Sequence, residues 1–151
     1  MKNQFCLHFP TMPKGTAQQK GYNRKTGKYF KKNTVANAEY EFKVRLIQHK
    51  PTKPSDKPIK LTILFNFDVK DKKLWGLPKT TRPDTDNYLK LFKDCMTDMG
   101  FWLDDSQVWD ERVVKVYSEQ ASITVIYEET DIEEMSTRNK AVGKAKKEGE
   151  T

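Results

Sequence analysis

The amino-acid sequence predicts a small single-domain α+β (α/β) protein in which a mixed sheet packs on helices. Some segments alternate apolar with polar residues, as half-buried strands do, and two others repeat apolar residues at helical spacing. The expected order along the chain is β-α-β-α-β-β. A chain of 151 residues with 36% hydrophobic content can enclose one core but hardly two, so we expect one domain.

The first strand and the first helix lie on either side of a long polar segment. Phe5, Leu7 and Phe9 alternate with polar neighbours until Pro10, which predicts a short strand. Residues 33–49 repeat apolar residues at helical spacing, which predicts a helix that faces the core. The helix residues that we expect to be buried are Ala36, Tyr40, Val44 and Ile47, with Phe42 and Leu46 beside them.

Residues 10–33 are expected to form a basic loop. They interleave basic residues with glycines and with three aromatic residues, Tyr22, Tyr29 and Phe30. Cations pair with phosphates and rings stack on exposed bases, so such a loop suits a nucleic-acid backbone. A solvated loop whose rings turn inward fits the same composition equally well.

Residues 59–69 have the clearest strand pattern, because apolar and polar residues alternate with Leu64 as the one exception. A second helix is expected to follow the acidic residues near position 84 and to end at Gly100, since glycine suits the left-handed position after a helix. Its apolar residues form two neighbouring stripes, wide enough to meet both core and partner. These are Leu89, Phe92, Met96 and Met99 in one stripe and Tyr88, Leu91 and Cys95 in the other.

The last two strands, residues 114–117 and 121–127, are expected to form a hairpin. After Tyr127 the sequence becomes highly charged and almost free of apolar residues. We therefore expect a domain at residues 1–127 and a tail at residues 128–151 that is either mobile or a lone charged helix.

The composition indicates a cytoplasmic protein that binds a polyanion. Lys and Arg total 28 against 21 Asp and Glu, a net charge of +7. Nucleic acid is favoured over a membrane, because no apolar run approaches the ~20 residues that span a bilayer. Residues 1–10 lack the apolar segment of a signal peptide. Cys6, Cys95, His8 and His49 show no zinc-ligand spacing, so zinc is not expected.

Residues 82–87, Arg-Pro-Asp-Thr-Asp-Asn, place two acids in a basic chain just before the second helix. Extended backbone after Pro83 would turn Asp84 and Asp86 to the same side. Asp86 or Asn87 is a suitable N-cap, and a helix N-terminus favours carboxylates and phosphates.

Lys90 and a second acidic pair complete this pattern. Lys90 stands four residues after Asp86, one helical turn on, so its ammonium would reach a phosphate held there. Asp104 and Asp105 follow a turn with apolar anchors, which would bring one of them back over the start of the helix. Carboxylates grouped in this way suit a hard cation such as Mg²⁺.

Each part of the pattern also has a plainer explanation. An Asp-x-Asp before a helix is often only a turn with a cap, and Asp-Asp is common in loops. An EF-hand is excluded, because counting from Asp84 puts Leu89 where glycine is required and Cys95 where the bidentate glutamate belongs.

The whole pattern closely resembles the RusA family of Holliday-junction resolvases. The resemblance is carried by Arg-Pro-Asp-x-Asp-Asn-x-x-Lys from residue 82, by Asp94, by Gly-Phe-Trp-Leu-Asp-Asp-Ser-Gln-Val from residue 100 and by Arg-Val-Val-Lys from residue 112. It is strong over residues 82–117 and weaker elsewhere. It departs at Pro83, where some members have arginine, so Arg82 or Lys79 would have to supply that phosphate contact.

The resemblance implies a homodimer that binds branched DNA and, with Mg²⁺ or a substituting Mn²⁺, nicks two strands of a four-way junction symmetrically. The implied catalytic residues are Asp84, Asp86, Lys90 and Asp105, of which the three aspartates would hold the metal. Asp104, Asp94 and Asn87 are expected to support them. The residues expected to contact DNA are Lys14, Lys20, Arg24, Lys25, Lys28, Lys72, Lys73, Lys79 and Arg82. The apolar face of residues 88–99 is a candidate for part of the dimer contact, unless it belongs to the core.

Two other functions fit the residues. A module that only binds branched or single-stranded DNA would use the same acids for structure. The second is a metal-dependent nuclease that acts on RNA or on flaps instead of four-way junctions.

Overall fold

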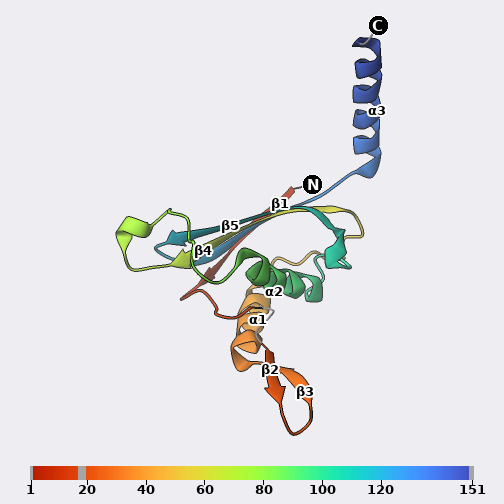
Figure 1. The fold of residues 1–151 in the computed structure, drawn as a ribbon. Helices are drawn as coiled ribbons and strands as arrows, with labels where there is room; N and C mark the ends of the chain where they lie inside the picture. Colours follow the sequence, from red (N-terminus) through yellow and green to blue (C-terminus); the bar gives the residue numbers. More distant parts are fainter. Residues whose placement is uncertain (1, 17–19, 150–151) are drawn as a thin grey trace.

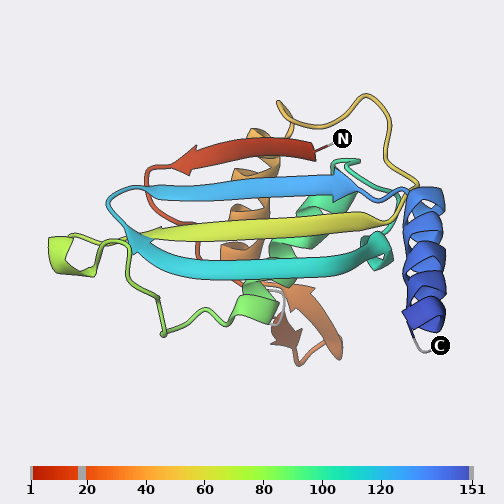
Figure 2. The ribbon, with the colours of Figure 1, turned by 90° about the horizontal axis from the view of Figure 1, so that it is seen from above.

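The computed structural model describes residues 2–16 and 20–149. The elements in chain order are β1 (Lys2–Phe9), β2 (Lys20–Asn23), β3 (Lys28–Lys31), α1 (Asn33–Leu46), β4 (Ile59–Asp68), η1 (Lys72–Leu74), α2 (Thr85–Asp98), η2 (Asp105–Gln107), β5 (Val108–Ser118), β6 (Ala121–Glu129) and α3 (Ile132–Gly149). A four-stranded sheet forms one layer, and α1 and α2 cover one of its faces (Figure 1, Figure 2). The predicted α+β class, with a mixed sheet packed on helices, is confirmed.

The position of β4 overturns the hairpin expected from the last two strands. The strand order is β1-β6-β4-β5, with β4 antiparallel to β6 and parallel to β5. Because β4 lies between β5 and β6, residues 119–120 cross its end instead of closing a hairpin. Every second residue of β4 from Ile59 to Phe67 is buried. In the centre of the sheet, β4 has a hydrogen-bonded neighbour on each side, and its apolar face is buried beneath the helices, as such a strand requires.

Residues 10–33 are not a loop throughout, since β2 and β3 pair as an antiparallel hairpin within them. Tyr22 and Tyr29 lie opposite each other, with ring centroids 5.0 Å apart. Gly27 closes the turn at φ 70°, and its N–H donates to the Asn23 carbonyl at 2.8 Å. Glycine adopts this left-handed conformation without a Cβ penalty. The hairpin escaped prediction because its strands are short and carry no apolar alternation.

Helix α1 buries a different stripe from the one predicted. Its buried residues are Val35, Ala38, Phe42 and Leu46. Of the residues expected in the core, Phe42 and Leu46 are buried, whereas four are exposed; they are Ala36, Tyr40, Val44 and Ile47. The rings of α2 decide between the two stripes, because Phe42 packs edge-on against Phe92 and Tyr88, at centroid distances of 5.2 and 5.9 Å.

The wide apolar face of α2 is core and not a dimer contact, so that suggestion was wrong. The buried residues of α2 are Tyr88, Leu89, Leu91, Phe92, Cys95 and Met96. The Tyr88 ring packs 4.8 Å from Phe65 on β4, and its hydroxyl donates to the Pro13 carbonyl at 2.7 Å. The helix is therefore held from both sides, which gives its N-terminal end a definite place beneath the sheet.

The charged segment after the sheet forms α3, which projects from one end of the sheet on the side away from α1 and α2 (Figure 1). Strand β6 runs through Glu129, so the sheet includes two residues that we expected to belong to the tail. No described helix has the length and the apolar character needed to cross a membrane.

Candidate active site

The acidic segment before α2 folds differently from the expectation, because the helix begins one residue after Asp84. Asp84 is itself the N-cap residue, with φ −67° and ψ 145°, and Asp86 lies in the first helical turn. The expected extended backbone from Asp84 to Asp86 is therefore wrong, and neither Asp86 nor Asn87 is the N-cap. The Asp84 carboxylate makes no capping hydrogen bond, and among the described residues its one hydrogen bond is a long one of 3.5 Å from the Asn87 amide. Asp84 and Asp86 thus both lie at the N-terminus of α2, where the helix dipole favours negative groups and where they can still bind a ligand.

Lys115 on β5 holds the segment that presents Asp84. Its ammonium donates to the carbonyl oxygens of Thr81 and Pro83, at 2.7 and 2.6 Å. Burial and the charge of Lys79 lower the pKa of Lys115, and the two charge-assisted bonds offset that cost. The sequence reasoning gave Lys115 no role, although it closes the Arg-Val-Val-Lys motif.

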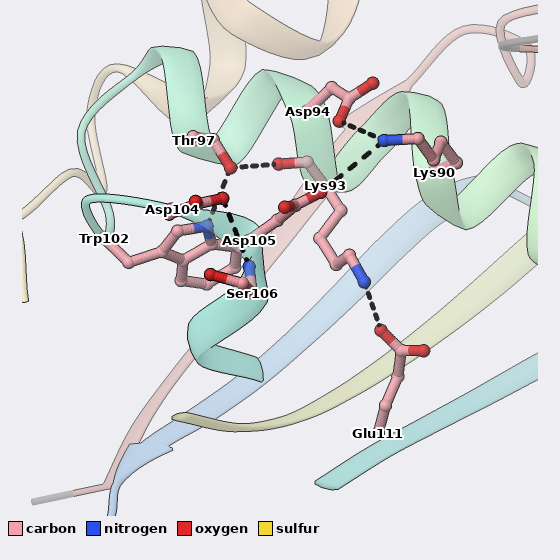
Figure 3. Close-up of polar contacts among 9 residues, drawn as sticks. All are labelled: Lys90, Lys93, Asp94, Thr97, Trp102, Asp104, Asp105, Ser106 and Glu111. Atoms are coloured by element: carbon pink, nitrogen blue, oxygen red, sulfur yellow. Dashed lines mark hydrogen bonds and ion pairs between the residues drawn. The ribbon is translucent and has the colours of Figure 1, made fainter. Parts of the chain in front are cut away.

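The turn after α2 brings the chain back alongside the helix (Figure 3). Gly100 has φ 85°, and the N–H groups of Gly100 and Phe101 donate to the carbonyls of Thr97 and Met96 at 3.0 and 3.1 Å. This is a Schellman motif, and it confirms the helix end predicted at Gly100. Trp102 is 1% exposed, and its indole N–H donates to the Thr97 hydroxyl at 2.8 Å. Phe101 and Trp102 are therefore buried anchors of this turn as expected, whereas Leu103 is 65% exposed and anchors nothing.

The adjacent acids Asp104 and Asp105 have separate tasks. The Asp104 carboxylate accepts the Ser106 N–H at 3.3 Å, and the Gln107 side chain in turn accepts the Asp104 N–H at 2.8 Å. The Ser106 N–H is the main cause that lowers the pKa of Asp104. Asp104 is thus engaged in the turn, and Asp105 is the acid directed at α2 (Figure 3).

Lys90 lies between Asp94 and Asp105 (Figure 3). Its ammonium is 3.0 Å from the Asp94 carboxylate and 3.6 Å from that of Asp105. The hydrogen bond to Asp94 is the main cause that raises the pKa of Lys90, so the lysine stays charged. Lys93 pairs with Glu111 of β5 at 2.7 Å and ties the helix to the sheet. The structure therefore brings Lys90, Asp94 and Asp105 together in one cluster.

The three aspartates expected to bind Mg²⁺ are not gathered around one point. Within residues 2–16 and 20–149, no group of three or more His, Cys, Asp or Glu side chains is placed to hold a metal ion. The donor chemistry nevertheless fits a hard cation, since Asp84 and Asp86 are exposed and Asp105 is partly exposed. These carboxylates, together with a phosphate oxygen, are the ligand types that Mg²⁺ takes.

Part of the basic surface lies on the β2–β3 hairpin. Arg24, Lys25 and Lys28 are exposed there, next to Tyr22 and Tyr29, which are 54% and 73% exposed. In Figure 1 the hairpin extends beyond α1, away from the sheet. The rings do not turn inward, which removes the alternative of a solvated loop with buried aromatics.

The other basic residues expected to contact DNA lie outside this hairpin. Lys72 and Lys73 are exposed in η1. Lys14, Lys79 and Arg82 line a cavity that opens beside Asp84. The side chain of Lys20 is outside the described part of the structure.

This cavity has a volume of about 590 Å³. Its walls are residues 11–16, the end of β4, Tyr117 and six residues from the segment before α2 and its first turn, namely Lys79, Arg82, Pro83, Asp84, Asn87 and Tyr88. Asp68, the last residue of β4, lies in its wall, yet the sequence reasoning gave neither Asp68 nor Tyr117 a role. A polar residue at the end of a strand carries no local signal, and only the fold places it near Asp84.

The family model described as endodeoxyribonuclease RusA matches residues 10–127. Over 127 residues the chain is 35% identical to the crossover junction endodeoxyribonuclease rusA of Lactococcus phage r1t, which covers 83% of this chain and 96% of that protein. The matched family region contains the acids and lysines described above and ends before α3.

Two further relatives differ in how much they share. The uncharacterized protein YqaN of Bacillus subtilis (strain 168) is 30% identical over 138 residues, which cover 82% of this chain and 96% of that protein. The crossover junction endodeoxyribonuclease RusA of Escherichia coli (strain K12) is 52% identical over 40 residues, 26% of this chain and 33% of that protein.

Proposed function

Because this chain belongs to the RusA family of endodeoxyribonucleases, we propose that it resolves four-way DNA junctions by paired symmetric nicks with Mg²⁺. Relatives from Lactococcus phage r1t and Escherichia coli are named crossover junction endodeoxyribonucleases. The observation that carries the proposal is the cluster of Lys90, Asp94 and Asp105, which lies inside the matched region and in which Lys90 follows Asp86 by one helical turn. Recombination, repair and phage DNA processing are the settings in which this activity would serve.

The residues divide the chemistry of phosphodiester hydrolysis among them. Asp84, Asp86 and Asp105 would hold Mg²⁺, with Mn²⁺ as a substitute. When bound, the ion polarises the phosphate and lowers the pKa of a water molecule. Lys90 stabilises the negative charge that develops on the phosphate oxygens, and the N-terminal amides of α2 act in the same direction.

Lys90 is placed so that a substrate phosphate can take over one of its two contacts with protein carboxylates. Its contact with Asp94, at 3.0 Å, is a hydrogen bond within α2 and holds the side chain beside the acids. Its contact with Asp105, at 3.6 Å, is a looser ion pair between partly exposed groups. A phosphate can therefore replace Asp105 as the second partner of Lys90, which frees the Asp105 carboxylate for the metal.

The exposed basic residues would collect and orient the DNA. Cations on the hairpin, in η1 and around the cavity neutralise phosphates, so binding is expected to weaken steeply as salt rises. The exposed rings of Tyr22 and Tyr29 would stack on unpaired bases near the branch point.

A homodimer would supply two such sites, one for each strand that is cut. The exposed stripe of α1 is our candidate contact, because Tyr40, Val44 and Ile47 are 66%, 43% and 54% exposed. A lysine in place of Val44 should then shift the protein to a monomer in sedimentation. A wild-type monomer at micromolar concentration with full paired nicking would exclude the dimer.

The proposed activity is tested on an end-labelled synthetic four-way junction, with and without Mg²⁺ and with linear duplex as control substrate. Asp86→Asn should abolish cutting while it keeps or strengthens junction binding, because a charge that repels DNA is lost. Asp98→Asn is the matched control, since Asp98 lies at the opposite end of α2, paired with Lys43 at 2.9 Å. It should cut like the wild type.

The alternatives predict other results. A module that only binds DNA would bind the junction without cutting it, and Asp86→Asn would change nothing. A nuclease for RNA or flaps would cut those substrates in competition with the junction, whereas a junction enzyme should ignore a large excess of linear duplex.

A further inference from the structure

A groove lies where α3 leaves the end of the sheet. In Figure 2, α3 stands at the end where β4 begins and β6 ends. The groove has a volume of about 630 Å³, within the roughly 300–1,000 Å³ of sites that hold a drug-sized ligand. Its walls are Pro58, Trp109, Thr130 and one face of α3, and that face consists of Ile132, Met135, Ser136, Asn139 and Lys140.

Trp109 is held as a rigid wall of the groove. Its indole N–H donates to the Thr130 hydroxyl at 2.9 Å, and the Thr130 N–H in turn donates to the Pro58 carbonyl at 2.8 Å. The Lys60 ammonium lies 5.3 Å from the Trp109 ring centroid. Because these contacts fix the ring while 49% of Trp109 stays exposed, a ligand can pack on the ring without first ordering it.

Apolar side chains of α3 extend this surface. Ile132 is 63% exposed and Met135 is 36% exposed, and both line the groove together with Trp109. Neither belongs to the hydrophobic core. Clustered apolar side chains that water can reach are typical of a surface that another molecule covers.

The charge beside this apolar surface is positive. Among the described residues that line the groove, Lys140 alone is charged, and Lys144 is exposed one helical turn further on. Two acids at the start of α3 are engaged elsewhere, since Asp131 accepts the first N–H groups of the helix and Glu134 pairs with Arg138 at 2.6 Å. A ligand of the groove should therefore carry apolar side chains next to negative charges.

The groove lies far from the acids at the start of α2. Strand β4 begins next to Pro58 and ends at Asp68, which lines the cavity beside Asp84, so its 10 residues separate the two sites by roughly 30 Å. A DNA strand held at Asp84 therefore leaves the groove open. Walls that are mostly apolar also suit peptide side chains better than a phosphate backbone. The matched family region ends before α3.

We propose that this groove binds a short segment of a partner protein in which acidic residues flank apolar side chains. An aromatic or aliphatic side chain packs against Trp109 and Met135, and a carboxylate pairs with Lys140. The inference goes beyond the proposed function and does not use the nuclease activity, so it stands even if the chain cuts no DNA. A partner that itself sits on DNA would keep this chain near its substrate while the acids at α2 stay free.

The test measures fluorescence anisotropy with the fluorescein-labelled peptide Glu-Glu-Leu-Phe-Glu-Glu and the full-length protein. One control peptide, Glu-Glu-Ser-Gly-Glu-Glu, keeps the charges and removes the apolar side chains. The other, Lys-Lys-Leu-Phe-Lys-Lys, keeps the apolar side chains and reverses the charges. The wild type should bind the first peptide at least about tenfold more tightly than either control, because apolar burial and attraction to Lys140 both contribute.

Substitutions in the groove locate the binding. Ile132→Asn and Lys140→Glu should each weaken binding of Glu-Glu-Leu-Phe-Glu-Glu about tenfold. Both side chains are exposed, so neither change removes a core contact. The matched controls are Leu77→Asn and Lys70→Glu, because both residues are exposed and lie near the other end of the sheet, beside Tyr117 and after the end of β4. Each control should bind within about twofold of the wild type.

Other results would overturn the proposal, and most of them name a different occupant. No binding of Glu-Glu-Leu-Phe-Glu-Glu, equal binding of the peptide that keeps only the charges, or unchanged binding by Ile132→Asn would exclude a peptide site in the groove. A wild-type dimer in sedimentation that Ile132→Asn separates would assign the groove to a second copy of this chain. Weaker binding of four-way junction DNA by Ile132→Asn and Lys140→Glu alike would assign it to DNA.

Discussion

Replacing Lys115 by methionine should cost this protein more activity than stability. The Lys115 ammonium is the donor that joins the Thr81 and Pro83 carbonyls to β5, immediately before the N-cap Asp84. Methionine keeps most of the apolar stem but removes both bonds. The segment before α2 is then free to move, and Asp84 loses its defined position.

The size of the effect follows from the two bonds. A hydrogen bond to a charged group contributes ~1.5–3 kcal/mol when it is protected from solvent. The Pro83 bond is partly buried, whereas water can replace the exposed Thr81 bond. Removing Lys115 also recovers the desolvation that lowers its pKa. We therefore expect the held position of the segment before α2 to lose about 2 kcal/mol of stabilisation. Since about 1.36 kcal/mol corresponds to a tenfold change in rate, the cutting rate should fall by roughly 30-fold at most.

The assay compares junction cutting with unfolding in urea. Because the segment can open while the sheet stays folded, the loss in global stability should be smaller than about 2 kcal/mol, and junction binding should change little. Lys2→Met is the control, since it removes one exposed lysine at the Glu128 end of the sheet. Cutting by Lys115→Met within about twofold of that control would refute the reasoning. A lower unfolding midpoint with unchanged cutting by the folded fraction would show a purely structural role.

Three further predictions concern Lys90, the two cysteines and α3. Lys90→Met should lower the cutting rate about 10²- to 10³-fold. It should alter the free energy of unfolding by less than about 1 kcal/mol, because the ion pairs of Lys90 are largely exposed. Since the pKa of Lys90 is raised, wild-type activity should not fall through deprotonation of Lys90 at neutral or mildly alkaline pH. A thiol reagent should label Cys6 alone in the native protein and Cys95 only after unfolding, because burial raises the pKa of Cys95 to about 12; fast native labelling of both would contradict the packing of α2. A chain that ends at Thr130 should keep its thermal midpoint within about 4 °C, because none of the described side chains of α3 belongs to the core, and calorimetry would detect a larger loss.

Several features of the fold could be predicted because they depend on neighbours along the chain. The alternation in β4 reports a buried face directly, and Gly100 ends α2 through bonds to the preceding turn. The resemblance of residues 82–117 was equally local, since it rests on residue types at short spacings. These patterns can be recognised without knowing which strand or helix packs against the segment.

The errors came from choices that local pattern leaves open. Helix α1 has two apolar stripes, and only packing against α2 decides that Phe42 is buried and Tyr40 is not. Residues 119–120 look like a hairpin turn, but β4 takes the place between the strands that they connect. Competition among elements for the same neighbour is a property of the whole fold, so periodicity alone does not reveal it.

For the candidate site, the sequence by itself determined which residue types are present, namely acids beside a lysine in a basic chain. The tertiary structure decided how they are used. It brought Asp105 to Lys90, engaged Asp104 in a turn, and placed Lys115 and Asp68 around Asp84 from strands distant in the chain. The physical reason is that residue chemistry is local, whereas the distances between side chains depend on long-range packing of the sheet against its helices.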